Sequence, residues 1–324
     1  MRIFSGIQPT GEVHIGNYSG AIKQWVDLQE KNECLFCIVD LHALTTPYDP
    51  EIFQKICLEK AIVYLAAGID PEKAIIFTQS AVREHTELCW LLCTITSLGE
   101  LYRMTQFKEK KKKSNENAGL LNYPILMAAD ILLYDTEIVP VGDDQKQHVE
   151  LAKDIARKFN SYFGETFTVP KAQILKTGAR IMSLSEPKKK MSKSGPRESY
   201  ISLFDSPEDI KKKISRAVTD TEKEIRYDTK KKPGISNLLS IYSIFSDKKI
   251  EEIEMEMKGK SYKKLKDEIS DLLIDKLEPF RRKRKELIER DVYVEEILKK
   301  GADRARILAE AKMKEVRKKM GIEK

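Results

Sequence analysis

The first hundred residues alternate short strand-like runs with helical patterns, and no other feature constrains the fold as strongly. Strand-like runs lie at 2–7, 34–41 and 74–78, and helical patterns lie at 50–68 and 84–98. Strands that are apolar along most of their length are buried on both faces, as in parallel sheets covered by helices. The alternation therefore predicts an α/β fold built on a parallel sheet.

The pattern continues with an apolar helix at 123–134, a strand at 136–141 and a helix at 144–159. From about residue 195 the chain becomes helical and charged, and Ser206 followed by Pro207 has the form of a helix N-terminus. Pro233-Gly234 and Glu278-Pro279 are expected to interrupt helices there. At 324 residues, two domains are the natural expectation.

The net charge of +7 is concentrated near the end of the chain. Residues 280–324 contain 16 Lys and Arg against 9 Asp and Glu, which accounts for the whole excess. This balance favours a polyanionic partner, with a solvated helical surface as the alternative. The longest nearly apolar stretch, 123–134, is too short to span a bilayer, and no signal peptide is apparent, so we expect a cytoplasmic protein.

The five cysteines do not form a disulfide or metal-binding pattern. Cys34 and Cys37 lie three apart in a strand-like run, which points their thiols to opposite faces. Cys89 and Cys93 lie four apart on an expected helix and have no second pair nearby. We therefore expect buried free thiols.

Two stretches are suited to binding phosphate. Residues 8–17 form a Gly- and Pro-containing turn between a strand and a helix, which directs backbone N–H groups at an anion, although neither GxGxxG nor a P-loop pattern is present. The second stretch, KKKMSKS at 188–194, joins small residues to mobile positive charge. Such a loop suits a departing pyrophosphate, whereas a lysine run alone is usually solvated surface.

Asp130 interrupts the apolar helix at 123–134. Burying a carboxylate costs several kcal/mol unless it has a partner. An ionised carboxylate only accepts hydrogen bonds, so Asp130 is suited to a partner or ligand that donates one.

Seven segments occur in an order that resembles a known family. They are FSGIQPTGEVHIGNY, TQFKEK, MAADILLY, VPVGDDQKQH, GARIMSL, KKMSKS and KPGISNLLSIYS. Together they resemble the bacterial-type tryptophanyl-tRNA synthetases, which are class I aminoacyl-tRNA synthetases. HIGN and KMSKS correspond to the family's HIGH and KMSKS motifs, with Asn17 in place of the last histidine.

The resemblance implies a Rossmann-like catalytic domain at 1–194, with a connecting insertion at about 88–170, and a helical anticodon-binding domain at 195–324. It also implies a homodimer that uses ATP with Mg²⁺ and binds tRNA(Trp). Tryptophan is first activated to tryptophanyl-adenylate with release of pyrophosphate, and the 2′-hydroxyl of the terminal adenosine of the tRNA then attacks the adenylate.

Site residues follow from the same resemblance. Those expected to take part in catalysis are His14, Asn17, Lys110, Lys190, Ser192, Lys193 and Ser194. Those expected to bind ATP are Gln8, Pro9, Thr10, Gly16, Asn17, Gly142, Asp143, Asp144, Ile181, Lys190, Met191, Ser192, Lys193 and Ser194. Those expected to bind tryptophan are Asp130, Phe4, Tyr123, Met127, Val139, Val141 and Gln145. Simpler explanations are helix capping for Asp143 or Asp144 and core packing for Met127, Val139 and Val141.

Three other functions remain open from the sequence. A tyrosyl-tRNA synthetase has the same fold and reaction, and Asp130 could also accept from a phenol. A small-molecule nucleotidyltransferase shares HIGH-type chemistry, but it would not account for the basic C-terminal region. A catalytically inactive RNA-binding paralogue would be unexpected with HIGN and KMSKS intact.

Overall fold

The structure is a computed structural model that describes residues 1–9, 11–105, 117–142, 145–174, 181–193 and 195–323. The chain divides into two compact units. Unit 1 comprises Met1–Thr10, Trp25–Leu175 and Arg290–Lys324, and unit 2 comprises Gly11–Gln24 and Lys176–Glu289. The expected boundary near residue 195 differs from this division, because residues from 290 onward pack with the N-terminal sheet.

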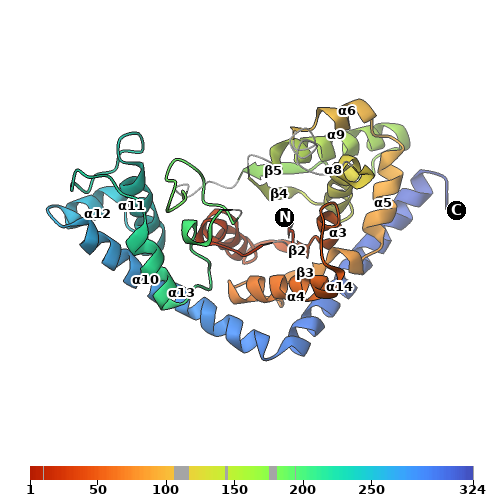
Figure 1. Ribbon diagram of the computed structural model, residues 1–324. Helices are drawn as coiled ribbons and strands as arrows, with labels where there is room; N and C mark the ends of the chain where they lie inside the picture. The colour runs from red at the N-terminus through yellow and green to blue at the C-terminus, as the bar shows by residue number, and fades with distance from the viewer. Residues whose placement is uncertain (10, 106–116, 143–144, 175–180, 194, 324) are drawn as a thin grey trace. The chain divides into compact units, whose positions relative to one another are not determined.

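Unit 1 is built on a five-stranded parallel sheet of order β3-β2-β1-β4-β5 (Figure 1). Its strands are β1 (Arg2–Ile7), β2 (Glu33–Ile38), β3 (Ala74–Thr78), β4 (Ile138–Val141) and β5 (Lys171–Ile174). β1 pairs with β2 on one side and with β4 on the other, so the chain order reverses at β1. Ligands of such sheets bind at the carboxyl ends of the strands near this reversal. The predicted α/β parallel sheet is confirmed.

The strands are buried because helices cover the sheet. The helices of unit 1 are α3 (Asp40–Ala43), α4 (Pro50–Ala66), α5 (Glu84–Cys93), α6 (Leu98–Arg103), α8 (Ala118–Leu132), α9 (Lys146–Phe163) and α14 (Asp291–Lys319). Asp49 caps α4 and Pro50 opens it, since proline needs no N–H at the first helical position. α8 packs against both α5 and α9, and the large apolar core lies among these helices and the sheet.

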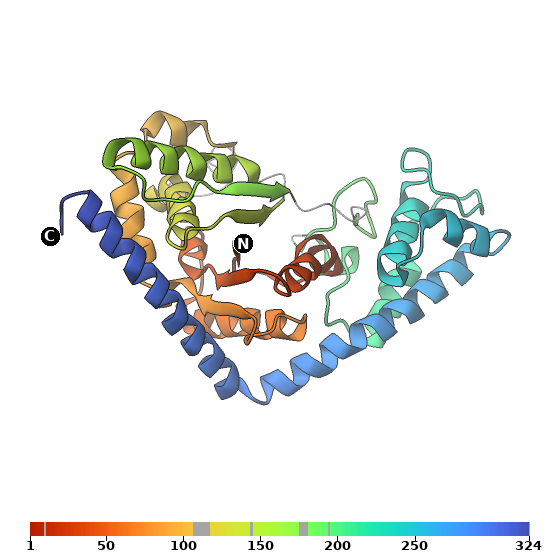
Figure 2. The same ribbon diagram turned by 180° about the vertical axis from the view of Figure 1, so that it is seen from behind.

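α14 packs along β3 and contacts α4 and α5 (Figures 1 and 2). Gly301 permits this contact, because a Cβ there would overlap the carbonyl oxygen of Ile76 in β3. Several basic side chains of α14 bond within unit 1: Arg306 donates to the Ala81 carbonyl oxygen, Lys312 to that of Thr166, and Arg317 pairs with Glu87. This part of the basic C-terminal region is therefore used in internal contacts.

Unit 2 contains the short helix α1 (Ile15–Asn17), a π-helical turn η1 (Tyr18–Ile22) and a helical group. The group consists of α10 (Pro207–Arg216), α11 (Pro233–Ser246), α12 (Ile250–Met257) and α13 (Tyr262–Ile288). α13 packs against α10 and α11, and α11 packs against α12. α2 (Lys23–Leu28) contains the boundary between the units.

Several element boundaries differ from the sequence predictions. β2 ends at Ile38 because Asp40 begins a short helix, and the helix predicted at 84–98 is split into α5 and α6. β5, with the mostly exposed sequence KAQI, was not predicted. The expected interruption at Pro279 is wrong, because Pro279 lies inside α13, and Arg281 there donates to the carbonyl oxygen of Ile274.

The cysteines are free thiols. Cys34, Cys37 and Cys57 are buried as expected, whereas Cys89 and Cys93 are only half-buried. In the described ranges, no helix is both long enough and apolar enough to cross a membrane.

Candidate active site

In unit 2, His14 shapes the HIGN turn. Its Nδ1 accepts the backbone N–H groups of Gly16 at 3.1 Å and Asn17 at 3.3 Å, while the Asn17 Oδ1 accepts the N–H of His14 at 3.2 Å. These bonds leave the hydrogen of the neutral imidazole on Nε2 and leave the Asn17 amide NH₂ as a donor. The turn thus presents two side-chain donor groups of the kind that bind phosphate oxygens.

The KMSKS loop is held by backbone pairing with the segment that contains Ile181. Met191 donates to the Ile181 carbonyl oxygen at 3.1 Å, and Ser183 donates to that of Lys189 at 2.8 Å. Asn237 of α11 fixes the same segment by exchanging two hydrogen bonds with the backbone of Met182, at 2.8 and 2.9 Å. Met191 and Ile181 are buried, whereas Lys190, Ser192 and Lys193 are exposed.

The two motifs lie against each other within unit 2. Gly11 has a φ of 65°, and a Cβ there would lie 3.0 Å from Nζ and 2.9 Å from Cε of Lys193. A Cβ on Gly16 would lie 3.0 Å from His14 Nδ1 and 3.8 Å from the Ile181 Cβ. Glycine therefore permits the close approach of these groups at both positions.

The lysines act electrostatically on His14. Burial, followed by the charges of Lys193 and Lys190, lowers the pKa of His14 from 6.5 to about 4. His14 is therefore neutral at pH 7. Although the Lys193 side chain is largely exposed, the surrounding protein partly desolvates its ammonium group and lowers its pKa.

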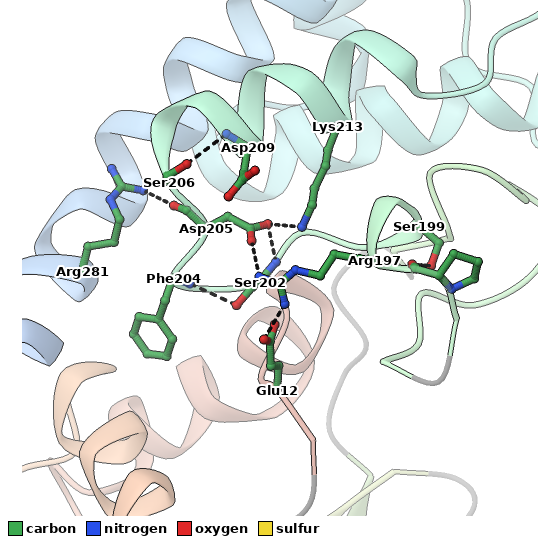
Figure 3. A network of polar contacts seen from close by, with 11 residues as sticks. Glu12, Arg197, Ser199, Ser202, Phe204, Asp205, Ser206, Asp209, Lys213 and Arg281 are labelled. Atoms are coloured by element: carbon green, nitrogen blue, oxygen red, sulfur yellow. Dashed lines mark hydrogen bonds and ion pairs between the residues drawn. The ribbon is translucent and has the colours of Figure 1, made fainter.

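Asp205 anchors the segment that supports HIGN (Figure 3). This buried carboxylate accepts from Lys213 Nζ at 2.5 Å, from the Ser202 N–H at 2.9 Å and from Arg197 at 3.3 Å. Arg197 also pairs with Glu12, two residues before His14. The neighbouring backbone completes the connection, because Ile15 donates to the Ile201 carbonyl oxygen at 3.0 Å.

In unit 1, three polar residues and one glycine follow the carboxyl ends of the strands. Gln8 follows β1, His42 follows β2, Gln79 follows β3 and Gly142 follows β4. This edge is where ligands of doubly wound sheets bind. Pro9, next to Gln8, is buried, while Gln8 and Gly142 are exposed.

Asp130 lies in α8 with only 1% of its surface exposed, and it has three side-chain donors. Its Oδ1 accepts from Gln79 Nε2 at 2.7 Å and from His85 Nδ1 at 2.6 Å, and its Oδ2 accepts from His42 Nε2 at 2.8 Å. Burial alone would raise the pKa of Asp130, but the hydrogen bonds that His42 and His85 donate hold it well below the usual range. Asp130 is therefore an ionised acceptor.

Of the other residues expected to contact tryptophan, Tyr123 lies beside the Asp130 partner His42, with ring centroids 6.2 Å apart. Tyr123, Met127 and Asp130 lie four and three positions apart, on one face of α8. The Tyr123 hydroxyl contacts His148 Nε2 at 2.9 Å, and burial raises the pKa of Tyr123 to about 12. Four expected residues are apolar and belong to the core or pack against it: Phe4, Met127, Val139 and Val141. Gln145 is half-buried and directly precedes α9.

Five predicted site residues lie outside the described residues: Thr10, Lys110, Asp143, Asp144 and Ser194. Within the described ranges, no group of three or more His, Cys, Asp or Glu side chains is placed to hold a metal ion.

The sequence prediction missed the partners of Asp130. His42, Gln79 and His85 lie 88, 51 and 45 positions away from it. The sequence carried no clear signal for these partners, because the burial of all four histidines is seen only in the folded structure. Histidine is less often buried than apolar residues, so four buried histidines indicate specific polar partners.

A family model described as "tRNA synthetases class I (W and Y)" matches residues 1–278. The chain belongs to this family. The match includes both HIGN and KMSKS and also covers Asp130, so the resemblance seen in the sequence is confirmed at the level of the class I tRNA synthetases.

Two curated relatives of this synthetase are about half identical to it. A tryptophan–tRNA ligase of Caldanaerobacter subterraneus subsp. tengcongensis is 53% identical over 323 residues, covering 99% of this chain and 98% of the relative. One of Bacillus anthracis is 51% identical over 322 residues, covering 99% and 98%. A crystal structure of tryptophanyl-tRNA synthetase from Campylobacter jejuni, complexed with ADP and tryptophan, is 40% identical, with a TM-score of 0.88 and coverage of 99% and 100%.

Proposed function

We propose that this class I synthetase is a tryptophan–tRNA ligase. It activates L-tryptophan with ATP to tryptophanyl-adenylate and pyrophosphate, and then transfers tryptophan to the 3′ end of tRNA(Trp). The choice of amino acid rests on relatives that are 53% and 51% identical over nearly the whole chain, both tryptophan–tRNA ligases. Asp130, a buried carboxylate kept ionised by three donors, is compatible with this choice. Such a group accepts and does not donate, which matches an indole N–H.

The remaining amino-acid contacts are assigned from the family resemblance. Phe4, Met127, Val139 and Val141 form the apolar walls for the indole ring. Tyr123 and Gln145 bind the ammonium group. The core packing of the apolar residues is compatible with this role, because a buried aromatic ligand needs walls that are already formed.

The residues proposed to bind ATP follow the family resemblance. In unit 2, His14 Nε2 and the Asn17 amide donate to phosphate oxygens, Gly16 leaves room beside the backbone, and Ile181 and Met191 contact the nucleotide. Lys190, Ser192 and Lys193, with Ser194, stabilise the charge that builds on the leaving pyrophosphate. In unit 1, the ATP-binding residues are Gln8, Pro9, Thr10, Gly142, Asp143 and Asp144, and Lys110 also reaches the phosphates.

Activation needs no enzyme nucleophile. The tryptophan carboxylate attacks the α-phosphorus in line, and the bond to the β-phosphate oxygen breaks. We include Mg²⁺, which binds ATP largely through phosphate oxygens and water and requires few protein ligands. The described residues offer no metal-binding group of their own, so no step is assigned to the ion.

The proposal extends to tRNA, to a second copy of the chain and to a cytoplasmic location, where tRNA is charged. In unit 2, a hollow of about 360 Å³ is lined in part by Phe204, Arg281, Arg284 and Lys285, which suits a backbone phosphate. Exposed apolar side chains support a homodimer, because α5 and α6 carry Trp90, 70% exposed, together with Leu98 and Tyr102.

Pyrophosphate exchange with each of the twenty amino acids tests the proposal. We expect exchange with tryptophan, and Asp130→Asn should raise the KM for tryptophan by at least roughly tenfold while the KM for ATP changes little. Exchange that is faster with tyrosine, or absent with every amino acid, contradicts the proposal.

A further inference from the structure

Asp130 belongs to a longer buried network that includes residues without a role in the proposed reaction. His85 contacts Asp130 through Nδ1 and the Tyr134 hydroxyl through Nε2, at 2.6 and 2.7 Å. His85 is fully buried, and Tyr134 is 1% exposed. The Tyr134 ring stacks on Phe4 at 5.8 Å and meets Phe77 edge-on at 5.9 Å. The network thus connects Asp130 to the apolar core of unit 1.

The network has a single consistent arrangement of hydrogens. Because ionised Asp130 only accepts, Nδ1 of His85 must carry a hydrogen. The Tyr134 hydroxyl has no other partner among the described residues, so its hydrogen is satisfied only if it is donated to Nε2 of His85. The result is a chain of two donations, from the Tyr134 hydroxyl to Nε2 of His85 and from Nδ1 of His85 to Asp130, with both hydrogens paired.

Gln79 supports the same carboxylate at a cost. Its Nε2 donates to Asp130 Oδ1, while its Oε1 is buried with no hydrogen-bond partner in the described part of the chain. Flipping the amide would place this oxygen against Oδ1 of Asp130, and two acceptors repel. An unpaired buried acceptor is unfavourable. The hydrogen bond that Gln79 donates to Asp130 therefore explains why its side chain keeps this orientation.

The three donors also determine what Asp130 can still accept. A carboxylate offers about four acceptor positions, and among the described residues two donors contact Oδ1 whereas only His42 contacts Oδ2. One acceptor position therefore remains, on Oδ2. Donors on both oxygens also resist rotation of the carboxylate, which fixes where that position lies.

We propose that Tyr134, His85 and Gln79 are positioning residues for amino-acid selection, which hold Asp130 so that its one remaining acceptor position receives the indole N–H. This inference rests on the proposed function. It adds that selectivity for the N–H group depends on the hydroxyl of Tyr134, which is connected to the carboxylate through two hydrogen bonds and is assigned no contact with the substrate.

The test compares two ligands in two variants. In L-3-benzothienylalanine, sulfur replaces the indole N–H, so the ratio of its Kd to that of L-tryptophan measures use of the N–H. We expect a ratio of roughly 10 to 100 for the unmodified protein by calorimetry, since the analogue leaves a buried carboxylate position empty. Tyr134→Phe keeps the ring but removes the donor, and it should reduce the ratio by roughly 3- to 10-fold.

Tyr64→Phe is the matched control. Tyr64 is also fully buried, but its hydroxyl has no hydrogen-bond partner among the described residues, so its loss should leave the ratio unchanged. His85→Asn provides a second variant and should reduce the ratio at least as much as Tyr134→Phe. If Tyr134→Phe weakens both ligands equally, or changes neither, the positioning role is wrong while the ligase function stands. If the unmodified protein does not bind tryptophan, both proposals are wrong.

Discussion

His14 of the HIGN motif should make the stability of the folded protein depend on pH. Its pKa in the folded protein is about 4, against 6.5 for an ordinary histidine, because of burial and the nearby Lys193 and Lys190. As pH falls below about 6.5, the unfolded chain takes up a proton at this site and the folded chain does not. The unfolded state then binds more protons, so stability falls with pH until about pH 4.

The expected size of this effect is roughly 2 kcal/mol between pH 7 and pH 5. Urea unfolding at the two pH values measures it. His14→Gln removes the titrating group, so the stability of this variant should decline less over the same interval. An equal decline in both proteins would mean that His14 is protonated in the folded state, contrary to its burial.

Single site residues such as Asp130 could be predicted from the sequence, but their hydrogen-bond partners could not. Asp130 was identified because a carboxylate in an apolar helix needs a reason to be there. Its partners could not be inferred, because they come from the ends of β2 and β3 and from α5, and only the folded sheet brings these together. The assigned roles of the site residues remain predictions.

The KMSKS loop is the element on which phosphate chemistry should depend most. Lys193→Ala should lower the adenylation rate by roughly 10²–10³, which is the usual loss when one charge-stabilising donor is removed from a transition state. Pyrophosphate exchange at saturating tryptophan and ATP measures this. Lys189→Ala is a control in the same loop, since the exposed Lys189 ammonium is already paired with Glu186 and should matter only a few-fold. Similar losses in both variants would indicate general loop damage.

Elements with strong local signals were predicted well. Ser206 does cap α10 by accepting the N–H of Asp209 at 3.1 Å, and Pro207 opens the helix as expected. β5 was missed because it is short, exposed and lacks an apolar pattern. Pro279 misled because a long helix packed on both α10 and α11 tolerates the loss of one backbone hydrogen bond.

At the scale of the molecule, unit 1 depends on a contact between distant parts of the chain. Gly301→Ala would place a methyl group against the Ile76 carbonyl and force α14 away from β3, so we expect a loss of about 1–3 kcal/mol or more in unfolding free energy. Gly99→Ala in α6 is the control, because its nearest neighbours are side-chain atoms at 3.4 Å or more, and alanine favours a helix. Urea unfolding compares the two, and equal stability would contradict the close packing of α14.

This contact could not be predicted from the sequence. The apolar face of α14 was visible in the spacing of Ala305, Ala309 and Val316, but the pattern does not say which surface it covers. The small residues on this face, with Gly301, fit an approach to the β3 backbone. Charge alone suggested a polyanionic partner for the same residues, whereas Arg306, Lys312 and Arg317 bond within unit 1.

The packing of α14 on β3 also affects the order in which the protein forms on the ribosome. Domains usually fold in the order of their synthesis. Here, residues 290–324 belong with the sheet whose first strand is translated nearly 290 residues earlier, and the whole second part of unit 2 is made in between. The β3 surface that α14 covers therefore stays exposed on the nascent chain until α14 has been synthesised.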